Sequence, residues 1–207
     1  MKTFDDAKRT YYHNGEVIAE KMITFDDATH TYYYNGEVIA NVSTILAETI
    51  FKDKYKNVPE HVLNNAASFG TNIHNAIEHM FPYGLDDVEY KKYQEYLSYV
   101  EQYFIITLEQ EQIVHNKELN YVGRFDLVAL IMGEKALCDV KTTYELDIEY
   151  LSWQLSMYYY GKRDFSIKKL YALWLPKRRK GGVVEIPFKT EQEVKWLVEK
   201  YYKENKK

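Results

Sequence analysis

Two aspartates stand in apolar segments on either side of Met132-Gly133, and six residues separate each aspartate from the centre of that pair. If the pair forms the turn of a β-hairpin, Asp126 and Asp139 face each other across adjacent strands, with Cβ atoms about 4.5–5.5 Å apart. Like charges in that position destabilise a sheet, and a carboxylate among apolar residues is costly unless it is paired. A divalent cation between the two aspartates resolves both costs.

Lys141 stands two residues beyond Asp139, so the two side chains share one face of the strand. Hard oxygen ligands of this type suit Mg²⁺ or Mn²⁺, with water and phosphate oxygens completing the coordination. The alternative is that both aspartates face solvent and that Lys141 is an ordinary ion-pair partner.

Two helical spacings accompany this hairpin. Gly70, His74 and Glu78 recur every four residues and share one helical face, and Gln154 and Tyr158 share a face of the helix that follows Lys141. A surface His–Glu pair and a satisfied polar patch are the simpler interpretations.

Composition limits the kinds of site. A single cysteine, Cys138, excludes an internal disulfide and a four-cysteine zinc or iron–sulfur site, so a metal would be held by oxygen or imidazole. The sequence shows neither a long apolar run nor a basic-then-apolar leader, so we expect a cytoplasmic protein without a membrane span.

Basic residues gather at one predicted hairpin tip. The net charge of −4 argues against a generally basic surface, but nucleic-acid binding requires only a local positive region. Lys177, Arg178, Arg179 and Lys180, followed by two glycines, could form a flexible basic finger that grips a phosphate backbone. A solvated turn is the alternative.

The N-terminal region is duplicated. Residues 3–19 and 24–40 match without a gap at 14 of 17 positions, and each copy alternates apolar and polar residues around an Asn-Gly pair, Asn14-Gly15 or Asn35-Gly36. Such a pair is a strong β-hairpin signal. Only the second copy continues directly into the rest of the chain, and Met22 precedes it. We therefore expect residues 1–21 to be an extra hairpin and residues 22–207 to form a single domain.

The remaining patterns predict a central sheet covered by helices, an α/β or α+β architecture. Helices are expected from about Pro59 to Met80, Asp86 to Glu109, Tyr144 to Tyr160 and Thr190 to Asn205, with the third opened by Thr142 and Glu145 as a capping box. Three strands are expected between residues 111 and 143, with turns near Asn120 and Met132-Gly133, and a further hairpin around 177–182.

Taken in order, Gly70-x-x-x-His74, Gly123-Arg124-Phe125-Asp126, Asp139-Val140-Lys141 and Gln154-x-x-x-Tyr158 resemble the RecB-like branch of the PD-(D/E)XK nuclease superfamily. The resemblance covers roughly residues 42–188. It implies a restriction-endonuclease-like mixed sheet flanked by helices. The hairpin that leads into "VSTIL" also resembles the start of phage-encoded members.

The resemblance implies a role for each motif residue. His74, Asp126, Asp139 and the Val140 carbonyl would ligate one or two Mg²⁺ or Mn²⁺ ions, and Lys141 would position and activate the attacking water. Gln154 and Tyr158 would contact nucleic acid near the scissile phosphate. Glu78 and Glu118 are further candidates for an outer or second-metal position. Some relatives carry cysteines for an iron–sulfur cluster, which this chain lacks.

The sequence thus predicts a metal-dependent DNA exonuclease of phage recombination, replication or DNA processing, acting in the bacterial host cytoplasm, with phage recombination or replication proteins as possible partners. A structure-specific or restriction-like endonuclease on the same fold is the rival enzyme. A nuclease fold kept only for DNA binding is disfavoured, because opposed carboxylates repel phosphate.

Overall fold

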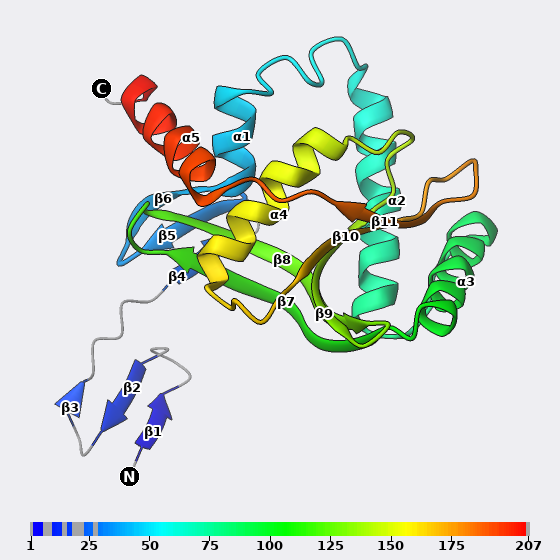
Figure 1. Ribbon diagram of the computed structural model, residues 1–207, viewed down its shortest axis with the longest axis horizontal. Coiled ribbons are helices and arrows are strands. Elements are labelled where there is room, and N and C mark those ends of the chain that lie inside the picture. The colour runs from blue at the N-terminus through cyan, green and yellow to red at the C-terminus, as the bar shows by residue number, and fades with distance from the viewer. Residues whose placement is uncertain (1, 6–9, 14–15, 18–22, 27–28, 206–207) are drawn as a thin grey trace. The chain divides into compact units, whose positions relative to one another are not determined.

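The computed structural model of the protein describes residues 2–5, 10–13, 16–17, 23–26 and 29–205 (Figure 1). The chain divides into two compact units, Met1–Asn41 and Val42–Lys207. Both copies of the repeat belong to the first unit, and the single domain over residues 22–207 stays a prediction.

Each copy of the repeat contains three antiparallel strands, one more than the predicted hairpin. The strands are β1 (Lys2–Asp5), β2 (Thr10–His13) and β3 (Glu16–Val17) in the first copy, and β4 (Ile23–Asp26), β5 (Thr31–Tyr34) and β6 (Glu37–Asn41) in the second. Their registers correspond, because Tyr12 pairs with Val17 and Tyr33, 21 residues later, pairs with Val38. Near-identical sequences therefore specify the same pairing twice.

The predicted turn of the second copy is confirmed. Asn35 and Gly36 have φ values of 55° and 83° and separate the paired residues Tyr34 and Glu37. Two consecutive left-handed residues form the tight hairpin turn that Asn-Gly favours. The corresponding Asn14-Gly15 and Met22 lie outside the described residues.

The second unit combines helices with a mixed, mostly antiparallel sheet, which confirms the predicted α+β class. Its strand order is β11-β10-β9-β8-β7, and only β9 and β10 run parallel. The helices are α1 (Val42–Thr49), α2 (Glu60–Glu78), α3 (Asp87–Gln102), α4 (Ile148–Lys162) and α5 (Glu191–Glu204); the strands are β7 (Ile106–Asn116), β8 (Tyr121–Ile131), β9 (Glu134–Lys141), β10 (Lys169–Trp174) and β11 (Gly182–Ile186).

Two helix boundaries differ from the sequence prediction. The helix expected to reach Glu109 ends at Gln102, because Phe104 takes a left-handed conformation (φ 49°) and strand β7 begins two residues later. Helix α4 starts at Ile148 instead of Tyr144. Its cap is Asp147, whose side chain accepts a hydrogen bond from the Tyr150 amide, so the predicted Thr142 capping box was wrong.

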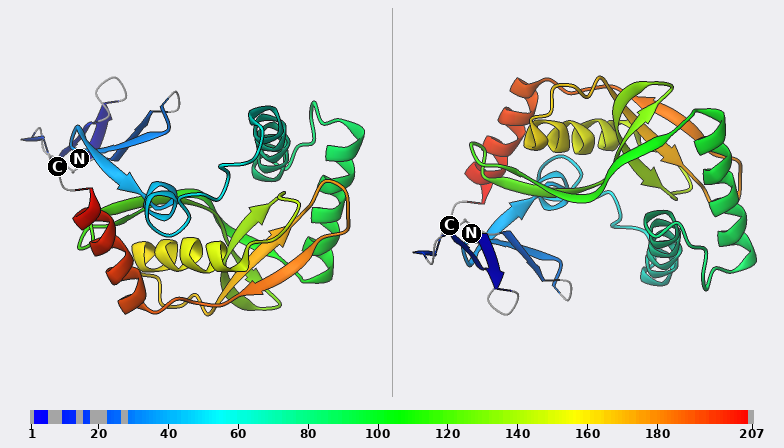
Figure 2. Two further views of the ribbon diagram at one scale, coloured as in Figure 1. Left: turned by 90° about the horizontal axis from the view of Figure 1, so that it is seen from above. Right: turned by 90° about the horizontal axis from the view of Figure 1, so that it is seen from below.

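One apolar layer joins α2 and α3 to the sheet. It contains tyrosines of α3 and its C-terminal end, of which Tyr93 and Tyr96 are buried and Tyr103 is partly buried. Helix α4 crosses β7 and β8, while α2 and α3 lie toward the other side of the sheet (Figures 1 and 2). Among the described residues, no helix combines the length and apolar character needed to cross a membrane.

The β8–β9 turn fixes the register of the two central strands as predicted. Met132 (φ 49°) and Gly133 (φ 85°) separate the paired residues Ile131 and Glu134. A Cβ on Gly133 would meet nothing within 4 Å, so the requirement for glycine there is purely conformational.

We therefore expect Gly133→Ala to lower the free energy of unfolding by about 1 kcal/mol through left-handed strain alone. Urea unfolding would measure it. Met132→Asn is the matched control: Met132 is exposed, and asparagine tolerates the left-handed region, so stability should be unchanged or higher. Equal stability of Gly133→Ala and the parent protein would contradict this account of the turn.

Candidate metal and phosphodiester site

Three carboxylates stand at one level of three adjacent strands. Asp126 immediately precedes Leu127, which pairs with Cys138, so the same register places Asp126 opposite Asp139. On the β7 side, Gln110 pairs with Leu127 and Gln112 pairs with Phe125. Glu111 therefore lies opposite Asp126. We call Glu111, Asp126 and Asp139 the carboxylate row. The predicted opposition of the two aspartates agrees with this register, and Glu111 is a third member that the sequence reasoning missed.

Backbone and lysine contacts hold two members of the row. Asp126 Oδ2 accepts a hydrogen bond of 2.6 Å from the Val140 amide. Asp139 is only 2% exposed, and its Oδ2 lies 2.7 Å from Lys141 Nζ. No described residue donates a hydrogen bond of good geometry to Asp139 Oδ2, although the Lys141 ammonium lies close to it. Asp139 is thus a buried acid whose main compensation is one lysine.

His74 reaches the row from α2. Its Nε2 lies 3.0 Å from the Val140 carbonyl oxygen, and its Nδ1 lies 3.7 Å from Asp126 Oδ2. A carbonyl oxygen accepts only, so this hydrogen bond requires a proton on Nε2. The Val140 carbonyl, a predicted metal ligand, is therefore engaged by His74 in this arrangement.

These side chains can hold a divalent cation. One ligand atom each of His74, Glu111 and Asp126 lies within 4.8 Å of the other two. An imidazole with two carboxylates suits Mn²⁺ and, through its oxygens, Mg²⁺. The fit is chemical as well as geometric, because adjacent carboxylates need positive charge between them.

The electrostatics of the row show a deficit of positive charge. Burial, followed by the charge of Asp126, raises the pKa of Glu111 to about 7, although Arg124, 3.1 Å from Glu111, opposes the rise. Burial, together with the charge of Asp126, raises the pKa of Asp139 to about 6, and Lys141 opposes that rise. A raised carboxyl pKa means that the folded site favours binding a proton, and a bound cation would satisfy the same demand.

Lys141 is held in its charged form. Burial works against the ammonium, but the carboxylates of Asp139 and Asp126 outweigh it and raise the pKa of Lys141 above its ordinary value. For Lys141 to give up a proton, a cation would have to neutralise these carboxylates.

Helix α4 places Gln154 and Tyr158 beside the row and beneath the surface. Gln154 Nε2 lies 3.1 Å from Tyr158 OH, and the two residues are only 7% and 5% exposed. Burial, followed by the charges of Asp139 and Asp126, raises the pKa of Tyr158 well above its ordinary value, which shows how near the ring is to the acids. Contact of Gln154 and Tyr158 with nucleic acid remains a prediction, and their burial limits it to a substrate that enters deeply.

Tyr150 continues the same stripe of α4, one turn before Gln154, and the sequence reasoning passed over it although the four-residue spacing was visible. Its pKa is raised by burial, while the nearby charge of Lys141 opposes that effect. Lys54 Nζ lies 3.7 Å from the Tyr150 ring centroid and 2.7 Å from Asp147 Oδ2. Tyr150 therefore connects the row to the segment that follows α1.

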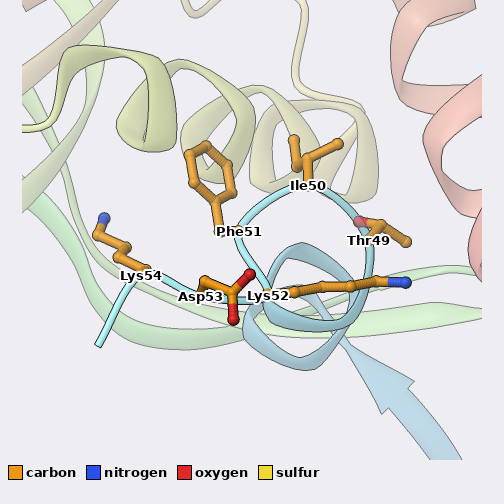
Figure 3. A pocket seen from close by; sticks show the side chains of 6 residues that line it. All are labelled: Thr49, Ile50, Phe51, Lys52, Asp53 and Lys54. Atoms are coloured by element: carbon orange, nitrogen blue, oxygen red, sulfur yellow. The ribbon is translucent and has the colours of Figure 1, made fainter. Parts of the chain in front are cut away.

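That segment surrounds a hollow that contains none of the predicted site residues. The hollow, of about 350 Å³, is lined by Thr49, Ile50, Phe51, Lys52, Asp53 and Lys54 (Figure 3). The carboxylate row forms no part of its lining, so we assign the chemistry to the row.

Two motif glycines explain how the helices approach the row. A Cβ on Gly123 would lie 2.4 Å from Cε1 of Tyr158, and a Cβ on Gly70 would lie 3.2 Å from Oγ1 of Thr142. The first distance is impossible without movement of the Tyr158 ring, whereas the second requires a small shift.

The remaining candidates lie at varying distances from the row. The charge of Glu78 contributes to the raised pKa of Glu111, so Glu78 is an outer neighbour of the row. Glu118 forms an exposed ion pair with Arg163, which gives it a surface role here. Lys177, Arg178, Arg179 and Lys180 occupy the exposed loop between β10 and β11.

Comparison with known proteins finds similar solved structures. No protein-family model matches the chain. No curated protein matches it either. The crystal structure of SSO0001 is similar over 80% of this chain and 75% of that chain, with 17% sequence identity and a TM-score of 0.49. A similarity at this level carries no information about chemistry.

The Gly123 contact leads to a prediction. Gly123→Ala should displace the Tyr158 ring and lower the free energy of unfolding by about 1–3 kcal/mol, the usual cost of overpacking a core. In a protein that already carries Tyr158→Ala, the Gly123→Ala change should cost less stability than it does in the parent, because the clashing ring is gone. Denaturant unfolding of the four proteins in this cycle measures the coupling, and strictly additive losses would rule out the clash.

Proposed function

We propose that this protein is a Mg²⁺- or Mn²⁺-dependent nuclease that hydrolyses phosphodiester bonds in DNA. The observation that carries the proposal is the carboxylate row, with His74 on one side and Lys141 ion-paired to Asp139 on the other. Its motif order resembles the RecB-like branch of the PD-(D/E)XK superfamily, which agrees with this chemistry.

Each part of the site has a role in this proposal. His74, Glu111 and Asp126 would hold a metal ion, with Asp139 close beside them. The bound ion would lower the pKa of a water molecule and offset charge on the phosphate. Lys141, whose side chain is 24% exposed while that of Asp139 is 3% exposed, would orient the attacking water and hold or move its proton at Nζ. Asp139 fixes the position of that ammonium.

The narrower proposal is an exonuclease of phage DNA recombination, replication or processing, acting in the cytoplasm of a bacterial host with other phage proteins. It follows from the family resemblance. A structure-specific or restriction-like endonuclease would use the same residues. A binding module without catalysis explains the row poorly, because a strand of phosphates is repelled by three carboxylates at one level.

Digestion of end-labelled linear and closed circular DNA in Mg²⁺ or Mn²⁺ tests the activity. Lys141→Ala should reduce cleavage by about 10²–10⁴-fold, the usual contribution of a positioned proton-transfer group. Lys135→Ala is the matched control on the same strand, because it removes a lysine that pairs with Asp164 instead of Asp139. Parent-level cleavage by Lys141→Ala would refute the site. Digestion of linear DNA alone indicates an exonuclease, and cleavage of circles indicates an endonuclease.

Metal binding can be tested without activity. Mn²⁺ at a hundred times its dissociation constant should stabilise the parent protein by about 2.7 kcal/mol. Asp126→Asn keeps an acceptor for the Val140 amide but removes one charge from the row. It should be more stable than the parent in chelator and should gain little from Mn²⁺.

Thermal unfolding with and without Mn²⁺ measures both effects. Glu101→Gln, which removes one exposed charge from α3, is the control and should behave like the parent. A metal-induced shift that is equal in Asp126→Asn and the parent would place the metal elsewhere.

A further inference from the structure

The loop between β10 and β11 carries four consecutive basic residues, Lys177 to Lys180, and all four are exposed. The sequence predicts a flexible finger there. The structure shows a loop whose backbone is fastened on both sides, and this difference has a consequence for how the protein holds its substrate. The inference rests on the proposed nuclease function and extends it to substrate binding.

Helix α3 fastens the loop through its backbone. Lys92, which is 8% exposed, donates a 2.6 Å hydrogen bond from Nζ to the Arg179 carbonyl oxygen. The Gly181 amide donates a 2.7 Å hydrogen bond to Glu95 Oε1, and Lys92 and Glu95 form an ion pair of 2.6 Å. Tyr99 OH also donates to Glu95 Oε1. The bonds to the loop use only its backbone carbonyl and amide groups.

The turn of the chain at Gly181 is equally constrained. A Cβ at this position would lie 1.7 Å from the Trp174 carbonyl oxygen, so only glycine allows the strand to return at this distance. Tyr99 OH lies 3.4 Å from the same carbonyl oxygen. The loop therefore has one backbone path, set by α3 and by the end of β10.

The other side of the loop is attached to the segment that follows Lys141. The Leu175 amide donates a 2.7 Å hydrogen bond to the Lys141 carbonyl oxygen. The Arg179 guanidinium lies 4.6 Å from the Trp174 ring and 4.8 Å from the Tyr144 ring, and it donates to the Tyr144 carbonyl oxygen at 2.5 Å. Arg179 thus links the loop to the segment just after β9.

Lys177 extends the attachment to α2. Its Nζ lies 4.9 Å from the ring centroid of Phe69, five residues before His74 on the same helix. The loop is therefore connected to the strand of Lys141 and to the helix of His74, the two elements that border the carboxylate row.

Arg178 and Lys180 are the two basic side chains of the loop that form no ion pair, hydrogen bond or ring contact with any described residue. Both are exposed and stand on a fixed backbone. A chain of net charge −4 with a row of acids in its site needs local cations to attract a polyanion, and these two are available.

We propose that the Lys177–Lys180 loop is a fixed phosphate-binding arch, in which Arg178 and Lys180 contact the backbone of the nucleic-acid strand beside the carboxylate row and the Lys92–Glu95 pair holds the arch in position. Arg178 and Lys180 are binding residues in this proposal, and Lys92 and Glu95 are positioning residues. A fixed cation loses less conformational freedom on binding than one on a flexible finger, so preorganisation strengthens binding without adding charge.

The first experiment removes the free charges. Binding of fluorescently labelled single-stranded and duplex oligonucleotides to the full chain is measured in chelator over a range of salt concentrations, so that cleavage is not needed for the readout. For Arg178→Ala/Lys180→Ala, affinity should fall similarly across sequences. The slope of log K against log salt for single strands should become shallower by about 1.4, at roughly 0.7 for each lost phosphate contact.

Lys195→Ala/Lys203→Ala is the matched control. It removes two exposed lysines from α5 and changes the net charge by the same amount. Parent-like affinity and slope are expected. If both double variants lose affinity equally, only total charge matters and the arch is refuted. If the parent binds no nucleic acid even at low salt, the arch is also refuted.

The second experiment loosens the arch without changing its charges. Glu95→Gln leaves Lys92 without its counter-charge and weakens the acceptor of the Gly181 amide. Hydrogen exchange at residues 179–182 should accelerate, affinity should fall, and the salt slope should stay at the parent value. Faster exchange with unchanged affinity would show that the arch need not be fixed. If Glu95→Gln does not fold, the Arg178→Ala/Lys180→Ala variant still decides the proposal, because it changes only exposed side chains.

These outcomes are separable from failure of the proposed function. Parent-like binding by Arg178→Ala/Lys180→Ala, together with metal-dependent cleavage by the parent protein, would overturn the arch and leave the nuclease intact. Loss of binding in that variant with no cleavage by the parent in any metal would support the arch and remove the catalytic proposal.

Discussion

The repulsion among three carboxylates at one level of the sheet is the constraint that organises this domain. Glu111, Asp126 and Asp139 occupy neighbouring strands, where like charges oppose pairing. The surrounding structure supplies partial compensation: an amide from Val140, an ammonium from Lys141 and an imidazole from His74. The raised pKa values of Glu111 and Asp139 show that this compensation is incomplete. A site that retains such a deficit is suited to a divalent cation, which is why we interpret it functionally.

Much of this row follows from local sequence rules. The Met132-Gly133 turn fixes the β8–β9 register, and counting outward from it predicts that the aspartates oppose each other. Glu111 was missed although the β7–β8 register is continuous from the Asn116–Tyr121 pair to the Glu109–Val128 pair. Counting outward from the turn at 117–120 would have placed Glu111 opposite Asp126, but the sequence located that turn only as near Asn120. Acids that share one level on a third strand are visible only after the strands are paired.

Predictions from the sequence failed where distant residues decide local structure. Thr142 and Glu145 have the spacing of a capping box, but Asp147 caps α4 and is also paired with Lys54, which lies more than ninety residues earlier. The same holds for the basic loop. Glycines and charges predict flexibility, whereas Lys92 and Glu95 on α3 fasten its backbone. Side-chain contacts across such sequence separations have no signature in a single sequence, so loop rigidity and exact helix starts were beyond its reach.

In the proposed nuclease, the groups that would attract the substrate are separate from those that would perform the chemistry. A carboxylate row that binds a cation has little net charge left with which to draw in a polyanion, and the chain as a whole is acidic. Further cations beside Lys141 in the row would compete with the metal for the same oxygens. The exposed positions of Arg178 and Lys180 avoid this competition, because the loop is attached beside Lys141 through Leu175 while its side chains stay outside the buried site. In this proposal, rigid attachment would let separate groups act on one strand, since a phosphate held by a moving loop would not be presented to Lys141 in a constant position.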